Sequence, residues 1–298
     1  MKVAENIGTL REEILGRKSE GKVVSFVPTM GALHGGHLSL VDIARKNSDY
    51  VVMSIFVNEL QFNSKEDLLN YPRTIGQDLD KAESVGVNLC FVPNAREIFS
   101  CGKTLDRMLG KESSVRRCTV KAGELADLWE GEYRKGHFDG VVSIVSILFN
   151  LVSPDVAIFG EKDFQQLKVI QQMVKDLHFP VNIVPAPLMR ESDGLAMSSR
   201  NLRLNDEQRM RALNIYKSLQ LSLKLVEEGE KKASKIIEPM REVLENQGKL
   251  KVDYVAVVDT DNLRAVDEIV DEARILVAAY VDEIRLIDNM HLTRAYKH

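Results

Sequence analysis

The sequence has few cysteines, no long hydrophobic run and no excess of basic residues. Its three cysteines, Cys90, Cys101 and Cys118, form no CxxC pair, so neither a disulfide framework nor a structural zinc site is expected. No apolar run approaches the roughly 20 residues that cross a bilayer, and the polar residues 1–22 contain no signal-peptide core. Lys and Arg total 40 against 44 for Asp and Glu, a formal net charge of −4, which argues against binding to a nucleic-acid backbone. We therefore expect a cytoplasmic protein with free thiols that binds neither membranes nor nucleic acid.

The first 187 residues instead contain an alternation of strand and helix patterns. Short, β-rich apolar runs lie at 23–27, 51–57, 89–92, 155–159 and 181–184. Helical patterns lie between them at 37–46, 77–84, 140–152 and 163–177. Such alternation predicts βαβ units and a parallel sheet. The fold class we predict is α/β, with a Rossmann-like, doubly wound sheet.

The segment 140–152 could be a helix or a strand, because it is rich in β-branched residues. Its polar residues Ser143, Ser146 and Asn150 fall at spacings of three and four, which places them on one stripe of a helix. We predict a buried helix with a narrow polar face, and a strand is the alternative.

After Pro187 the pattern changes to helices followed by strands. Asn205 and Gln208 have the spacing of a helix N-cap and its capping-box partner, and Gly229 is a fitting C-terminal stop. Period-two alternation over 219–225 would suit a strand, but the cap and the length favour a helix. A second helix is predicted at 237–246, because Pro239 is tolerated only in a first turn. Strands are predicted at 252–258, 275–281 and 284–286. These elements predict a smaller α+β domain at 188–298, after a larger domain at 1–187.

The segment 28–37, Pro-Thr-Met-Gly-Ala-Leu-His-Gly-Gly-His, follows the first predicted strand and opens the next helix. Ligands of doubly wound sheets bind beyond the carboxyl ends of the strands, and glycines beside the free N–H groups of a helix start admit phosphate. His34 and His37 are three residues apart, so both could donate hydrogen bonds to charge that develops on a phosphate. An ordinary turn with two surface histidines is the alternative. A metal pair is disfavoured, because no third ligand with suitable spacing is visible.

Two later segments have the residues to contact phosphates. Lys162, in the turn 160–163, stands just past a strand and just before a helix, at the same end of the sheet as the first loop. In the segment 193–201, small residues and hydroxyls surround Arg200, which suits a loop that wraps phosphate oxygens. Ser198 could instead be a nucleophile, but no Gly-x-Ser-x-Gly elbow surrounds it.

Glutamines could contact a small substrate. Gln61 follows the second strand, and its amide both donates and accepts, which suits a small hydroxy acid. Capping a loop is the alternative. Gln165 and Gln166, one turn into the helix after Asp163, could face the same crevice.

Taken together, these segments resemble the pantothenate synthetases, or pantoate–β-alanine ligases. The matching stretches, in family order over most of the chain, are PTMGALHGGHLSL, SIFVN followed by QF, YPRT, GHFDGV, LFNLVSPD, FGEKDFQQL, DGLAMSSRN and RLIDN. The histidine pair also looks like the HIGH signature of the nucleotidyltransferase superfamily, and MSSR occupies the place of its second phosphate loop. The resemblance implies that 1–187 binds nucleotide and pantoate, that 188–298 is a lid domain, and that the protein is a homodimer.

The resemblance also implies the reaction. ATP and pantoate would give enzyme-bound pantoyl adenylate and pyrophosphate, and β-alanine would then attack to give pantothenate and AMP. ATP is thus a substrate and Mg²⁺ a cofactor. A carboxylate is a poor acyl donor, and adenylation gives it a good leaving group. No covalent enzyme intermediate is needed, which agrees with the lack of a nucleophile motif.

The family's functional residues are carried over by position. His34 and His37 would stabilise the transferring phosphate, with His37 as the proton donor, and Lys162 and Arg200 would complete the catalytic set. The ATP contacts would be Met30, Gly31, Ala32, Leu33, His34, Gly35, Gly36, His37, Gly160, Glu161, Lys162, Asp163, Met189, Met197, Ser198, Ser199 and Arg200.

Three further positions concern the other substrates and the metal. Gln61 and Gln166 would bind pantoate, and Gln61 would also border β-alanine. Asp78, an acidic position after YPRT, would help hold magnesium.

The sequence departs from the family's usual pattern at several positions. Gly35 stands where Glu or Lys is common, Glu59 where Pro is common, Asp139 where Arg is usual and Ile147 where Lys is usual, and the stretch 101–117 is divergent. These departures affect the pantoate pocket and any gating loop above it.

Glu59 and Asp139 add negative charge to segments expected to border two anionic substrates. We expect either that both side chains point into solvent or that Lys65, Arg73 or Arg134 neutralises them.

Two other functions stay open at this point. The chain could be a nucleotidyltransferase that releases an adenylylated small molecule, although QF and GEKDFQQL argue against it. It could also be an ATP-binding regulatory homologue without turnover, which the Glu59 and Asp139 departures leave possible.

Overall fold

The computed structural model describes residues 1–99 and 119–292. The contacts within the chain divide it into two compact units. The first consists of Met1–Asp127, Arg134–Glu161 and Gln166–Pro187, and the second of Leu128–Tyr133, Lys162–Gln165 and Leu188–His298. Cys101, Cys118 and the divergent stretch 101–117 lie outside the described residues, and Cys90 is buried in the first unit.

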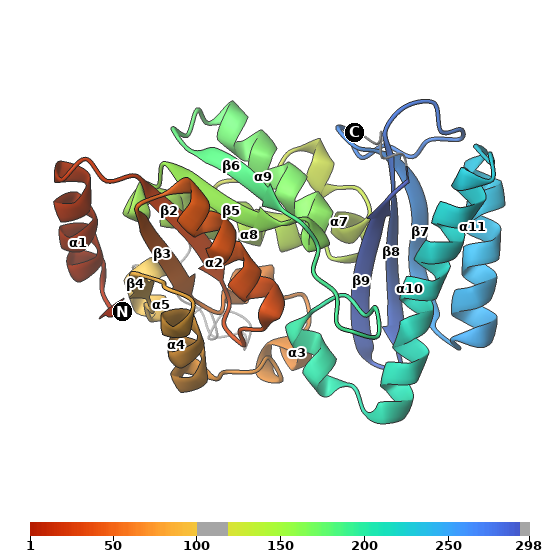
Figure 1. The fold of residues 1–298 in the computed structure, drawn as a ribbon, viewed down its shortest axis with the longest axis horizontal. Coiled ribbons are helices and arrows are strands. Elements are labelled where there is room, and N and C mark those ends of the chain that lie inside the picture. The colour runs from red at the N-terminus through yellow and green to blue at the C-terminus, as the bar shows by residue number, and fades with distance from the viewer. Residues whose placement is uncertain (100–118, 293–298) are drawn as a thin grey trace. The chain divides into compact units, whose positions relative to one another are not determined.

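The first unit is built on a six-stranded sheet in the order β1–β4–β3–β2–β5–β6, in which all neighbouring strands are parallel (Figure 1). Its strands are β1 (Lys2–Ala4), β2 (Val24–Thr29), β3 (Tyr50–Ile55), β4 (Leu89–Phe91), β5 (Val156–Gly160) and β6 (Asn182–Ala186). From β2 the chain proceeds to β3 and β4 on one side and later returns to β5 and β6 on the other. Ligand crevices form at such a switch point. The predicted Rossmann-like parallel sheet is therefore confirmed.

Helices cover both faces of this sheet. They are α1 (Ile7–Ser19), α2 (Gly35–Asn47), α3 (Lys65–Leu69), α4 (Ile75–Ser84), α5 (Ala95–Phe99), α8 (His137–Val152) and α9 (Phe164–Asp176), with short 3₁₀ turns η1 (Glu59–Gln61) and η2 (Glu124–Ala126). Adjacent residues of a strand point to opposite faces. Accordingly, Val27 packs in the cluster that contains Leu40 and Val41 of α2, whereas the ring of Phe26 meets that of Phe149 in α8.

The segment 140–152 is helical, as predicted. It belongs to α8, in which Ser143 and Ser146 are buried and Asn150 is exposed. The Ser146 hydroxyl donates to the carbonyl of Val142, and the Asn150 amide donates to that of Ser146. Polar side chains on this stripe thus bond back to the helix itself, which makes their burial tolerable.

The second unit contains an antiparallel sheet of three strands, β7 (Lys251–Asp259), β8 (Ala273–Val281) and β9 (Ile284–His291), in sequence order. Its helices are α7 (Glu130–Tyr133), α10 (Asp206–Glu227) and α11 (Ala233–Glu242), with the 3₁₀ turn η4 (Ser199–Arg203) and a π-helical turn η5 (Val243–Gln247). The 3₁₀ turn η3 (Glu161–Asp163) spans the junction of the two units. Alternate β8 residues pack with α10 and α11 in one core.

The two predicted helices of this unit have different outcomes. The Asn205 capping box is present, with reciprocal bonds to Gln208, and α10 ends just before Gly229, whose φ is 97°. The second helix was misplaced: α11 runs over 233–242, and Pro239 lies inside it rather than in its first turn.

The reason for this error lies in the packing of α11. Ala233, Ile236 and Met240 form its buried face. The carbonyl four residues before Pro239, which the proline cannot bond, belongs to the exposed Lys235. Burial of the apolar face therefore outweighs the cost of the proline.

The first 22 residues carry two elements that the sequence patterns did not reveal, β1 and α1. Asn6 is the N-cap of α1, and its side chain accepts a hydrogen bond from the Thr9 N–H at 2.9 Å.

No helix in residues 1–99 and 119–292 combines the length and the apolar character needed to span a bilayer.

Candidate active site

The segment 28–37 connects the end of β2 to the start of α2, at the switch point of the sheet. Gly31 and Ala32 have φ values of 84° and 50°, so the chain turns through the left-handed region. A Cβ on Gly31 would lie 3.0 Å from Oδ2 of Asp78 and 3.1 Å from Cγ2 of Ile55. Glycine is needed here both for the backbone angle and for this close approach.

Asp78 in α4 fixes the backbone of this turn by hydrogen bonds. Its side chain is buried, and it accepts hydrogen bonds from the Ala32 N–H at 2.9 Å and the Leu33 N–H at 2.7 Å. The Thr74 hydroxyl adds a third bond at 3.1 Å, and Lys81 Nζ donates to the Leu33 carbonyl at 2.8 Å. The carboxylate thus serves as an anchor for the loop backbone, a role that the sequence patterns did not indicate.

His34 and His37 stand at the start of α2, and their ring centroids are 4.0 Å apart. The His34 N–H donates to Nδ1 of His37 at 3.4 Å. The three-residue spacing therefore does bring the two imidazoles together. The first turn of a helix also leaves backbone N–H groups without intrahelical partners, which favours an anion beside these rings.

Gln61 is a buried glutamine in η1, directly after β3. Its Oε1 accepts from Nδ2 of Asn58 at 3.0 Å, and its Nε2 lies 2.9 Å from Sδ of Met30. A sulfur is a weak acceptor, so this amide keeps hydrogen-bonding capacity for a ligand. Gln61 thus contacts the segment 28–37 at Met30, and its role in binding a substrate stays a prediction.

The backbone of Gln61 is fixed by the GHFDG segment at the start of α8. Nδ1 of His137 lies 2.7 Å from the Gln61 carbonyl, and Nη2 of Arg134 donates to the same oxygen at 3.2 Å. Asn58 Nδ2 also donates to the carbonyl of Gly140 at 3.0 Å. These partners are 73 to 82 residues away in sequence, so no local pattern could indicate them.

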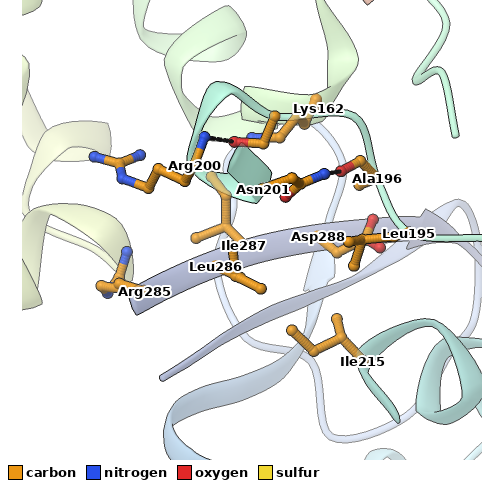
Figure 2. Close-up of a pocket in the computed structure, with 11 residues that line it drawn as sticks. Lys162, Leu195, Ala196, Arg200, Asn201, Ile215, Arg285, Leu286, Ile287 and Asp288 are labelled. Atoms are coloured by element: carbon orange, nitrogen blue, oxygen red, sulfur yellow. Dashed lines mark hydrogen bonds between the residues drawn. The ribbon is translucent and has the colours of Figure 1, made fainter. Parts of the chain in front are cut away.

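The second unit brings Lys162, Ser198 and Arg200 together around a hollow (Figure 2). The Ser198 hydroxyl accepts from the Arg200 N–H at 3.3 Å, which caps η4. The remaining lining residues are Leu195, Ala196, Asn201, Ile215, Arg285, Leu286, Ile287 and Asp288. Three basic side chains, Lys162, Arg200 and Arg285, and a hydroxyl around one hollow are typical of a phosphate site.

The other predicted residues are placed as follows. Met189 is exposed, and its carbonyl accepts from the Met197 N–H at 3.0 Å. Gln166 is half-buried. Gln165 does not face a crevice: its Oε1 accepts from the Glu130 N–H at 3.0 Å, and its Nε2 donates to the Leu128 carbonyl at 2.7 Å. It is a structural residue that holds the segment 128–130.

The described residues contain no group of three or more His, Cys, Asp or Glu side chains able to hold a metal ion.

A family model described as pantoate–β-alanine ligase matches residues 2–291. The chain belongs to this family. It is 45% identical over 290 residues to a pantothenate synthetase of Thermoanaerobacter pseudethanolicus, covering 97% of this chain and 98% of that one. It is 47% identical over 286 residues to that of Aquifex aeolicus, covering 96% of each.

Solved structures of family members have the same fold. A pantothenate synthetase from Thermus thermophilus superposes with a TM-score of 0.88 at 39% identity, over 99% of this chain and 100% of that one. A pantoate–β-alanine ligase from Francisella tularensis, complexed with β,γ-ATP and β-alanine, gives 0.76 at 30% identity and covers 98% of both chains.

The two departures from the family pattern near Gln61, Asp139 and Glu59, are both half-buried. Oδ1 of Asp139 accepts a hydrogen bond from the Ala122 N–H at 2.9 Å. We had expected either exposure to solvent or a neighbouring cation, and not a backbone donor. One oxygen of Glu59, Oε2, is buried and accepts no hydrogen bond from any residue that the structure describes. Burial raises the pKa of the Glu59 carboxyl, and the nearby charge of Arg73 opposes this shift. Arg73 is one of the cations that we expected to act on Glu59.

Replacing Glu59 by the proline that is common in the family is expected to stabilise the protein. Glu59 is the first residue of η1, where the N–H has no partner within the turn and proline is tolerated. Proline restricts the unfolded chain, which raises the free energy of unfolding by about 0.4–1 kcal/mol. Removing the partly buried carboxyl adds to this gain. The measurement is the free energy of unfolding from urea titrations.

The pH dependence separates the two contributions. Because the folded pKa of Glu59 is raised, ionisation destabilises the folded state, and stability is lost as pH rises from 4.5 through the raised value. The gain in Glu59→Pro should therefore be larger at pH 7 than at pH 4. Glu59→Gln should show only the pH-dependent part. An advantage of Glu59→Pro that is equal at both pH values would show that burial of this carboxyl costs nothing.

Proposed function

We propose that this protein catalyses the ATP-dependent condensation of pantoate with β-alanine to give pantothenate, AMP and pyrophosphate. The observation that carries the proposal is the contact between Gln61 and Met30, since it joins a neutral amide suited to a hydroxy acid to the loop suited to ATP. Membership in the pantoate–β-alanine ligase family supports the same reaction.

In the first step, a carboxylate oxygen of pantoate attacks the α-phosphorus of ATP, and the bond to the bridging oxygen of pyrophosphate breaks in line. Charge builds on the phosphate oxygens, and preorganised donors stabilise it. His34 and His37 supply imidazole donors, with His37 as the proton donor, and their ring centroids lie 4.0 Å apart. Lys162, Ser198, Ser199 and Arg200 bind phosphate oxygens, and Gln61 and Gln166 orient pantoate.

In the second step, the amine of β-alanine attacks the acyl carbon of pantoyl adenylate. The bond between this carbon and the phosphate oxygen breaks, AMP leaves, and the amine loses a proton. Gln61 borders the amine in this step. The buried and fixed amide of Gln61 allows it to serve both substrates in turn.

Magnesium would enter this site bound to the phosphates of ATP. Both oxygens of Asp78 accept hydrogen bonds from loop donors, so Asp78 is poorly suited to be a direct metal ligand. Mg²⁺ is commonly bound by substrate phosphates with few protein ligands. We propose that it neutralises phosphate charge in this way, while Asp78 holds the loop. The homodimer, the cytoplasmic location and the lid role of 188–298 stay predictions.

Product analysis distinguishes this reaction from the two alternatives. With ATP and pantoate alone, we expect pyrophosphate in an amount roughly equal to that of the enzyme, and free AMP only after β-alanine is added. A nucleotidyltransferase would release an adenylylated product continuously without the amine. A regulatory homologue would bind ATP and form no pyrophosphate. Either of these results would reject the proposal.

A further inference from the structure

The RLIDN segment, residues 285–289, lies on β9. Four of its residues line the hollow in Figure 2, although the steps proposed above give none of them a role. Two of its residues, Asp288 and Asn289, are each 4% exposed although both are polar. As neighbours on a strand they point to opposite faces of the sheet. β9 is an edge strand of the described sheet β7–β8–β9.

Asn289 holds the backbone at Lys162. Its Nδ2 donates to the Lys162 carbonyl at 3.0 Å, while its Oδ1 accepts from Nη1 of Arg274 at 2.6 Å. The guanidinium of Arg274 is itself fixed, 3.9 Å from the ring centroid of Phe164. The amide of Asn289 is therefore oriented by one partner and uses its other end to hold the turn that carries Lys162.

Asp288 holds the segment that leads to Ser198 and Arg200. Its carboxylate forms two hydrogen bonds with Arg190, at 2.6 and 3.0 Å. Arg190 lies 4.4 Å from the ring centroid of Tyr216 and donates to the Gly194 carbonyl at 3.1 Å. Arg190 also forms an antiparallel bridge with Ala196, which closes a small hairpin ahead of the phosphate loop.

A buried ion pair contributes little net stability, because desolvation offsets much of the attraction. A role in fixing geometry explains the Arg190–Asp288 pair better. We propose that Asp288 and Asn289 are positioning residues for phosphate binding, and that together they set the separation between Lys162 and the Ser198–Arg200 loop. This inference rests on the proposed function, because it takes the hollow in Figure 2 as the site of the ATP phosphates.

The main test is Asn289→Asp. Aspartate has the same shape and still accepts from Arg274, but it has no N–H for the Lys162 carbonyl. We expect the Kd for ATP, measured by calorimetry without pantoate, to rise about tenfold or more, as a displaced binding group requires. The KM for pantoate should change less than twofold. The matched control is Asn182→Asp at an exposed residue of β6, which should leave both values unchanged.

A second variant, Asp288→Asn, tests the contact between Asp288 and Arg190 without changing the shape of the side chain. It removes the charge that holds Arg190, and the Kd for ATP should again rise about tenfold. If folded Asn289→Asp and Asp288→Asn proteins bind ATP as the wild type does, the positioning role is wrong. A lower melting temperature together with an unchanged Kd for the folded fraction would contradict the positioning role as well.

The proposed function is judged separately. If the wild type binds ATP but forms no pantothenate, the reaction is rejected, whereas the ATP affinities of the two variants still decide the positioning role.

Discussion

His37→Ala is expected to slow the formation of pantoyl adenylate by about a hundredfold or more, the scale found when one transition-state donor is removed. The Kd for ATP should change much less, because the imidazole acts mainly when charge develops on the phosphate. The structure adds a reason to expect this. Because Nδ1 of His37 accepts from the His34 N–H at 3.4 Å, we expect Nε2 to be the ring nitrogen that donates to the phosphate. Single-turnover formation of pyrophosphate from ATP and pantoate measures the rate.

Two further substitutions separate catalysis from helix capping. Asparagine carries its amide oxygen close to the position of Nδ1, so His37→Asn keeps an acceptor for His34 and lacks a donor at the Nε2 position. Glutamine reaches further and can place a donor there. We expect His37→Asn to be as slow as His37→Ala, and His37→Gln to recover part of the rate. If His37→Asn has full activity and the same melting temperature as the wild type, His37 only caps the helix and is not the proton donor.

The parts of the site that the sequence predicted are those that depend on short spacings and on the ends of strands. His34 and His37 meet because residues three apart share one side of a helix turn. Gln61 lies beside the loop at Met30 because neighbouring parallel strands end at the same edge of the sheet. Local periodicity and the rules of parallel sheets suffice for such predictions.

The parts that the sequence did not predict depend on distant partners. Asp78 was expected to help hold magnesium, yet its oxygens bond to loop N–H groups 45 and 46 residues earlier in the chain. His137 and Arg134 bond to the carbonyl of Gln61, a group that every residue type carries. A side chain that binds a backbone carbonyl leaves no sign of its partner in the sequence, so only the folded chain reveals the pair.

The division of the chain has a similar explanation. The segment 128–133 precedes α8 in sequence but belongs to the second unit. Oε1 of Glu130 accepts from the hydroxyl of Tyr254 at 2.9 Å, and Nη1 of Arg285 donates to Oε2 of Glu130 at 2.8 Å. The buried charge of Glu130 finds its partner 155 residues later, so a boundary read from local composition cannot assign this segment.

Gly140→Ala is expected to destabilise the protein more than any other substitution named above. A Cβ at this position in α8 would lie 2.5 Å from the Leu60 carbonyl oxygen and 2.7 Å from the Gln61 nitrogen. Both are backbone atoms, so no side-chain rotation relieves the clash. Overpacking of this kind costs about 3 kcal/mol, which lowers the melting temperature by about 5–10 °C in a chain of this size. Thermal unfolding followed by circular dichroism measures it.

The same clash gives Gly140→Ala a kinetic effect that distinguishes it from ordinary destabilisation. To admit the methyl group, η1 must move away from α8, and Gln61 moves with it. The KM for pantoate should therefore rise about tenfold or more in the folded fraction, because displacement of a positioning group by about 1 Å has this scale. Gly16→Ala is the matched control, since Gly16 is also helical and a Cβ there meets nothing within 4 Å. It should gain up to about 1 kcal/mol from the better helix propensity of alanine and keep a normal KM. An unchanged KM in Gly140→Ala would mean that Gln61 does not bind pantoate, because the substitution acts on the backbone that carries this side chain.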